Sequence, residues 1–218
     1  MTLWLTRIIP DQRSRDARRD SDHAIDLHHR MMSLFPDSVA DTEARRRLGV
    51  LFRTESTTAG QQILLQSARP PDLDRLPAGY GQAATKTLFP LLEALRDGLQ
   101  VRYRIAANPI RRPSRATREL YQLKAVVPLQ GAAAEDWWTR QSEATGLTLA
   151  TLRSTPLDAA RGRRRSDQRP IQHDRVLFEG TAVITDADRL RTRLTDGIGK
   201  GKAYGCGLLS IAPHREAQ

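Results

Sequence analysis

Alternating and periodic apolar residues divide the first half of the chain into short strands and helices. Residues 2–9 alternate and end at Pro10, which predicts a strand. Apolar residues from Ala24 to Leu34 recur at helical spacing, and Pro36 closes the predicted helix, for which Ser21 and Asp22 are N-cap candidates. Residues 48–53 and 61–67 flank Gly60 and predict a hairpin, residues 83–96 are weakly helical, and residues 100–106 alternate as a fourth strand.

The order of these elements predicts the fold class. Strand, helix, two strands, helix and strand over residues 1–107 form the ferredoxin-like unit, which RNA-recognition modules also use. Residues 108–218 repeat this order, with strand pieces at 108–113 and 124–129, a helix from Glu135 to Gly146, strands at 147–153 and 176–185, and a short helix capped by Asp186. We therefore expect an α+β protein of two tandem ferredoxin-like (RRM-like) domains, 1–107 and 108–218, with an insertion at 154–175.

Glycines gather near the end of the chain. Five of the fourteen glycines lie in residues 197–207, together with Lys200 and Lys202, and a short apolar run follows. Glycine permits left-handed backbone angles, and successive exposed N–H groups can form an anion-binding concavity. This glycine loop is either a phosphate-binding loop that leads into a last strand or a glycine-rich turn with solvated lysines.

The charge balance favours a polyanionic partner. Lys and Arg number 35 against 25 Asp and Glu, a formal net charge of +10, and arginine suits phosphate contacts. The insertion contains a dense group of arginines: Arg161, Arg163, Arg164, Arg165, Arg169 and Arg175. We expect the insertion to be a mobile loop or hairpin tip, and its arginines either contact RNA or are simply solvated.

Composition also excludes several classes of protein. Cys206 is the single cysteine, so an intrachain disulfide and a cysteine-rich zinc site are excluded, and we expect it to be a small buried residue. No signal-peptide pattern precedes the first strand and no apolar run approaches 18 residues, so we expect a cytoplasmic protein without a membrane span.

Several motifs together resemble one family. The glycine loop and the following run, residues 205–213, resemble the C-terminal signature of CasE, the CRISPR repeat-processing endoribonuclease of the type I-E Cascade complex. Matches in the same order occur along essentially the whole chain, at residues 3–9, Leu27-His28, 34–36, 64–67, 106–109 and 176–180.

The resemblance implies an activity and partners. A CasE-like protein binds the stem-loop of precursor CRISPR RNA and cuts it at the base of the stem without metal or other cofactor. Cleavage would give a 2′,3′-cyclic phosphate and a 5′-hydroxyl, and the enzyme would stay on the mature RNA with the other Cascade subunits. No membrane or small-molecule cofactor is implied.

The resemblance also assigns site residues. His28 matches the catalytic histidine, and an imidazole can act as acid or base near neutral pH. Ile25 occupies a position that is tyrosine in some relatives, so the second catalytic group stays open among Arg30, Ser33, Lys202 and the substrate itself. Lys202 matches a lysine of the family's glycine loop and is assigned to phosphate contact. Lys200 has no firm counterpart in the family, and we expect it to make a peripheral RNA contact.

Other residues receive assignments from the sequence alone. Arg111 and Arg112 are expected to contact RNA, and the pair Trp137 and Trp138 is expected to contribute one core residue and one interface residue, with base stacking as the alternative.

Two rival functions remain. Ile25 favours a non-catalytic RNA-hairpin-binding subunit of the same fold, whereas His28 favours the endoribonuclease. A weaker third hypothesis is a basic double ferredoxin-like protein that binds ribosomal or messenger RNA.

Overall fold

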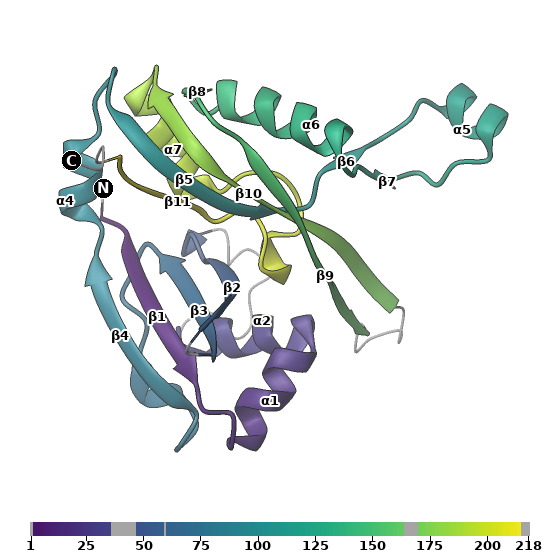
Figure 1. Cartoon of the computed structure of the whole chain (residues 1–218). Coiled ribbons are helices and arrows are strands. Elements are labelled where there is room, and N and C mark those ends of the chain that lie inside the picture. The colour runs from purple at the N-terminus through teal and green to yellow at the C-terminus, as the bar shows by residue number, and fades with distance from the viewer. Residues whose placement is uncertain (1, 36–46, 59, 164–169, 215–218) are drawn as a thin grey trace.

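The computed structural model describes residues 2–35, 47–58, 60–163 and 170–214, which form two antiparallel sheets (Figure 1). The first sheet has the strand order β2-β3-β1-β4. Its strands are β1 (Trp4–Pro10), β2 (Leu51–Thr57), β3 (Gly60–Ser67) and β4 (Gly81–Thr87). Helices α1 (Arg15–Asp22) and α2 (Ala24–Ser33) pack with this sheet. The periodic residues Leu27 and Met31 enter its core beside Ile8, Phe52 and Leu65, as the helical spacing predicted.

The second sheet has the order β11-β5-β10-β8, and β9 also pairs with β10. Its strands are β5 (Gln100–Ala107), β8 (Leu147–Leu149), β9 (Arg153–Arg163), β10 (Pro170–Ile184) and β11 (Leu209–Pro213). Helices α6 (Ala132–Glu143) and α7 (Ala187–Asp196) pack with it, and Trp138, Phe178, Leu190 and Ile105 lie in the shared core. Asp186 caps α7 as predicted, because its side chain accepts from the N–H of Arg189.

Shorter elements connect these layers. They are the helix α4 (Phe89–Ala94), the 3₁₀ turns η2 (Leu73–Arg75) and η3 (Lys202–Tyr204), and a ribbon of β6 (Ile110–Arg111) and β7 (Val127–Pro128) joined through α5 (Arg115–Tyr121). None of the helices within the described residues is long and apolar enough to cross a membrane.

Both sheets have ferredoxin-like topology, so the predicted fold class is confirmed, but one strand belongs to a different unit from the one we predicted. Residues 100–106 were expected to end the first unit. In the structure β5 pairs with β10 and β11 and opens the second unit, because Val101, Tyr103 and Ile105 pack into the second core. The fourth place of the first sheet is filled by β4, within the stretch predicted to be helical. The sheets therefore divide between β4 and β5 rather than after residue 107.

Two other local predictions were wrong. The basic stretch after Pro10 was read as a loop but contains α1, which Ser14 caps by accepting from the N–H of Ala17. Trp137 and Trp138 are both buried, and the ring of Trp138 stacks on Phe178 with centroids 5.7 Å apart. Neither indole is therefore available to an interface or to a base.

The buried side chain of Arg53 joins the two sheets. From β2 its Nη1 donates to the carbonyl oxygens of Arg104 (3.0 Å) and Leu208 (2.9 Å). Its Nη2 donates to the hydroxyl of Ser210 (3.0 Å), and its Nε donates to Glu55 (2.9 Å). Only 2% of Arg53 is exposed. Three of these hydrogen bonds cross to the second unit and fix the relative position of the sheets, and hence of anything built where they meet, while the bond to Glu55 stays within β2.

Candidate active site

His28 lies on the half-buried side of α2, next to the core residue Leu27. The helix contacts both η3, in the glycine loop, and β9. A Cβ atom built on Gly162 of β9 would lie 3.0 Å from Cγ1 of Ile25, so Ile25 packs directly on that strand. The position that is tyrosine in some relatives of the CasE family is thus a packing contact between the helix and the hairpin.

The glycine loop brings Lys202 to this helix. Gly201 and Gly205 adopt left-handed angles (φ 76° and 79°) on either side of η3, and Lys202 is the first residue of that turn. The Nζ atom of Lys202 donates to the carbonyl oxygen of Asp196 at 2.6 Å. The structure therefore brings the elements that carry His28 and Lys202 into contact, although they are far apart in sequence.

Cys206 lies beneath this turn and is fully buried. Burial raises the pKa of its thiol to about 12, and the nearby Arg175 opposes the rise. The predicted role of Cys206 as a small buried residue is confirmed by its burial, and a thiol with a raised pKa is a poor nucleophile at neutral pH.

Three residues that the sequence analysis did not single out hold the glycine loop in place. The ring of His173 on β10 stacks on Tyr204 of η3, with centroids 4.7 Å apart and planes at 22°. The Nδ2 of Asn108 donates to Nδ1 of His173 at 2.9 Å, and the backbone of Asn108 forms an isolated bridge with Lys200. Burial lowers the pKa of His173, with Asp174 opposing, and the hydrogen bond from Asn108 requires an unprotonated Nδ1. We call Asn108, His173 and Tyr204 the loop clamp.

A bulge in β9, opposite Asp174 of β10, lies beside a cation that reaches the same loop. The pairing of β9 and β10 shifts register between His173 and Arg175, and bulges of this kind redirect side chains. The Nε of Arg175 donates to the carbonyl oxygen of Asp158 at 2.7 Å, and its Nη1 lies 3.5 Å from the hydroxyl of Thr54. A Cβ atom on Gly205 would lie 3.6 Å from that Nη1. Arg175 is therefore a second cation beside η3, contributed by the opposite hairpin strand.

Two of the residues considered as a second catalytic group have structural roles instead. The Nε of Arg30 donates to Asp20 at 2.7 Å, and the Asp20 carboxylate is buried. The hydroxyl of Ser33 donates to the carbonyl oxygen of Arg30 at 2.9 Å. Lys202, the third candidate side chain, lies outside α2, on the turn η3 that contacts this helix.

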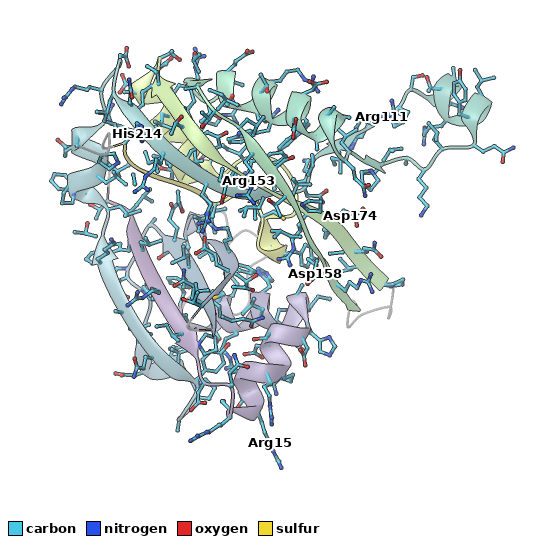
Figure 2. All side chains as sticks on the ribbon, viewed as in Figure 1. Arg15, Arg111, Arg153, Asp158, Asp174 and His214 are labelled. Atoms are coloured by element: carbon cyan, nitrogen blue, oxygen red, sulfur yellow. The ribbon has the colours of Figure 1, made fainter. Side chains whose placement is uncertain are left out.

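The predicted RNA-contacting arginines lie on two projections. The insertion at 154–175 forms the hairpin of β9 and β10 rather than an irregular loop, and Arg161 pairs with Gln172 in it. Arg163 ends β9, whereas Arg164, Arg165 and Arg169 lie outside the described residues. Arg111 and Arg112 are exposed at the base of the β6–β7 ribbon, and Figure 2 shows Arg111 there and Asp158 and Asp174 on the hairpin. Lys200 is exposed at the edge of the glycine loop.

No group of three or more His, Cys, Asp or Glu side chains that could hold a metal ion occurs in the part of the chain that the structure describes. The cationic side chains described beside η3 are Lys202, which begins that turn, and Arg175 of β10.

The fold places this chain in the class of proteins with two ferredoxin-like units. The histidine-bearing helix, the glycine loop and the basic hairpin are typical of members that bind nucleic acid. Residues 3–213 match the family described as CRISPR associated protein. The chain belongs to this family, and within it to the CasE family that the motifs resembled.

Individual relatives cover almost the whole chain. The CRISPR-associated endoribonuclease Cse3 of Thermus thermophilus is 33% identical over 97% of this chain and 100% of its own length. The CRISPR system Cascade subunit CasE of Escherichia coli is 27% identical over 90% of this chain and 96% of its own length. A solved structure of Thermus thermophilus Cse3 bound to an RNA representing a pre-cleavage complex has a TM-score of 0.81 at 30% identity, covering 98% of this chain and 100% of that chain.

Proposed function

We propose that this protein is an endoribonuclease that cleaves precursor CRISPR RNA at the base of the repeat stem-loop and then remains on the mature RNA as a Cascade subunit. The observation that carries the proposal is the contact of α2 with η3, which brings the elements of His28 and Lys202 together beside the basic hairpin. The names of the relatives support the substrate and the complex. We also propose a cytoplasmic location and a division of labour between two domains that meet between β4 and β5.

The chemistry uses a nucleophile that RNA itself supplies. The 2′-oxygen attacks the adjacent phosphorus while the bond from phosphorus to the 5′-oxygen breaks, which yields a 2′,3′-cyclic phosphate and a 5′-hydroxyl. One group takes the proton of the 2′-hydroxyl and one gives a proton to the leaving 5′-oxygen. His28 performs one of these transfers, since an imidazole can do either near neutral pH.

Cationic side chains stabilise the phosphate as it gains charge. Lys202 supplies one ammonium group from η3, and Arg175 supplies a guanidinium from β10 on the other side of that turn. Fixed cations in a partly desolvated site are worth more than in water and need no reorganisation during the reaction. This arrangement accounts for cleavage without a metal ion.

The alternative is a subunit that binds the RNA hairpin without cutting it. Ile25 supports this alternative, because it fills with a packing contact the position where some relatives have a tyrosine. His28 and the loop clamp support the enzyme, because a purely binding surface does not need a glycine loop held against a histidine-bearing helix.

Replacement of His28 with alanine tests the proposal. The His28→Ala variant should cut a cognate repeat hairpin roughly 10²–10⁴-fold more slowly and bind it with unchanged affinity, and the wild-type rate should persist in EDTA. His29→Ala is the matched control, because His29 is the exposed neighbour on the same helix. Wild-type cleavage by His28→Ala would refute the assignment, and absence of cleavage by the wild-type protein itself would favour the binding subunit.

A further inference from the structure

The β6–β7 ribbon and α5 together form an arm, residues 110–128, that the catalytic proposal does not use. Figure 1 shows the arm extending away from the body of the molecule. No residue of α5 is buried, and its last two residues, Leu120 and Tyr121, are 73% and 66% exposed. Large apolar side chains displayed side by side on a projecting element indicate an interaction surface.

Local hydrogen bonds at both ends of α5 and at the base of the arm define its shape. Ser114 caps α5 by accepting from the N–H of Thr117 at 3.1 Å, and Gln122 ends the helix in a left-handed conformation (φ 51°). At the base, the N–H of Leu129 donates to the carbonyl oxygen of Pro109 at 2.9 Å. A helix of seven residues is marginal in water. A bound partner that covers the exposed tip would therefore stabilise it.

The charge of the arm identifies the partner as a polyanion. The arm carries five cations against the single carboxylate of Glu119, and that carboxylate already accepts from Arg115 at 2.8 Å. The cations are Arg111, Arg112, Arg115, Arg118 and Lys124. Basic side chains on the same arm as an exposed aromatic ring fit single-stranded RNA, whose phosphates take the charges and whose unpaired bases stack on the ring.

The base of the arm lies beside the active site. Asn108, two residues before β6, bonds to His173 of β10 and bridges to Lys200 of the glycine loop. The base of the arm and the hairpin of β9 and β10 are therefore in contact through Asn108 and His173. An RNA that is held by the hairpin and cut at α2 can extend along the arm without leaving the protein.

We propose that the arm binds an unpaired segment of the substrate RNA, with Tyr121 stacking on a base and the surrounding cations contacting its phosphates. The inference rests on the proposed function for the identity of the RNA. Binding is nevertheless measured separately from cleavage, so the two proposals can fail independently.

The test compares two RNAs with 2′-deoxy substitution at the cut site, which cannot be cleaved. One is the repeat hairpin with single-stranded flanks and the other is the same hairpin without flanks. Tyr121→Ala should weaken binding of the flanked RNA about tenfold, and Tyr121→Phe, which keeps a ring, should restore it. If Tyr121→Ala changes the affinity for the unflanked hairpin by less than about twofold, the arm binds a flank. If the affinities for both RNAs fall equally, the arm binds the hairpin loop.

Two further variants keep the test decisive. Phe89→Ala on α4 removes another exposed aromatic ring and should leave both affinities unchanged. Lys124→Gln should lower the salt slope of the flanked RNA by about 0.7, the value for one phosphate contact on a single strand. Unchanged affinity in Tyr121→Ala together with an unchanged slope in Lys124→Gln would overturn the proposal and leave a protein partner as the occupant. These experiments measure binding alone, so a negative result would not contradict the catalytic role proposed for His28.

Discussion

The imidazole of His173 and the phenol ring of Tyr204 stack with their centroids 4.7 Å apart, so the hairpin of β9 and β10 and the glycine loop share one contact. His173 comes directly before the register shift in β10, and Tyr204 ends the turn that Lys202 begins. The contact links the position of the hairpin to the position of a cation in the proposed active site.

Removing this contact should impair cleavage more than binding. His173→Ala loses both the ring and the hydrogen bond from Asn108, and we expect single-turnover cleavage to fall about tenfold, because small displacements of a positioning group are costly. His173→Phe keeps the ring and should recover part of the rate. RNA affinity should change less than about twofold in both variants, and a fall in affinity equal to the fall in rate would contradict a positioning role.

The loop clamp should also depend on pH. Burial lowers the pKa of His173 below its ordinary value of 6.5. Its contribution to stability is therefore complete above about pH 6.5 and is lost as pH falls through the folded-state pKa. The groups around the ring are Asn108, Tyr204 and the opposing carboxylate of Asp174. The difference in unfolding free energy between the wild type and His173→Phe should shrink between about pH 7.5 and about pH 5, and a constant difference would exclude the mechanism.

Arg53 should be among the most sensitive positions for stability. Arg53→Ala leaves the Glu55 carboxylate and two carbonyl oxygens without their buried partner, and we expect a loss of about 3–5 kcal/mol in chemical denaturation. Arg96→Ala is the control, because Arg96 is exposed and surface substitutions usually stay within about 0.5 kcal/mol. Similar losses in both variants would mean that the connection between the sheets contributes little.

Two glycines of the loop should differ in their tolerance of alanine. Both have left-handed angles, φ 79° at Gly205 and 87° at Gly207. A Cβ atom on Gly205 would lie 3.5 Å from Phe52, an ordinary contact, so the cost is the conformational one of about 1–2 kcal/mol. On Gly207 it would lie 2.7 Å from the carbonyl oxygen of Ile198, so the backbone must move. Chemical denaturation should give Gly207→Ala a much lower free energy of unfolding than Gly205→Ala, and equal values would contradict this account.

The arginine hairpin should determine the salt dependence of RNA binding. Neutralising Arg163, Arg164 and Arg165 with glutamine should weaken binding, and the slope of log affinity against log salt should fall by roughly 0.7 to 0.9 for each phosphate that the protein no longer touches. Replacing the exposed Arg96, on the loop after α4, controls for net charge. An unchanged slope would show that these three arginines do not contact the RNA.

Local signals in the sequence predicted the elements better than their assembly. The Asp186 cap and the Leu27–Met31 stripe are determined by neighbouring residues, and both appear as expected. The alternating residues of β5 predict that one face of the strand is buried, but they do not predict which sheet the strand joins. Its sheet is determined by pairing with β10 and β11, which lie far along the chain. The strand β4 was missed because an exposed edge strand has no need of apolar alternation.

The candidate site shows the same division. The glycines and Lys202 were visible in the sequence because they gather in one short stretch. The loop clamp was not visible, because Asn108, His173 and Tyr204 come from three separate stretches and only folding brings them together. Arg175 was visible as one arginine among several, and only the bulge distinguishes it from the others.

The connection made by Arg53 has a consequence for the order in which the protein can be completed during synthesis. Arg53 leaves the ribosome early, but its acceptor on Leu208 is 155 residues further along the chain. Until that carbonyl group emerges, the guanidinium on β2 must stay hydrated, and the first sheet cannot close on its neighbour. Native structure is thus completed only after β11 has been synthesised, so a nascent chain interrupted before β11 would present an unfinished surface to chaperones and proteases.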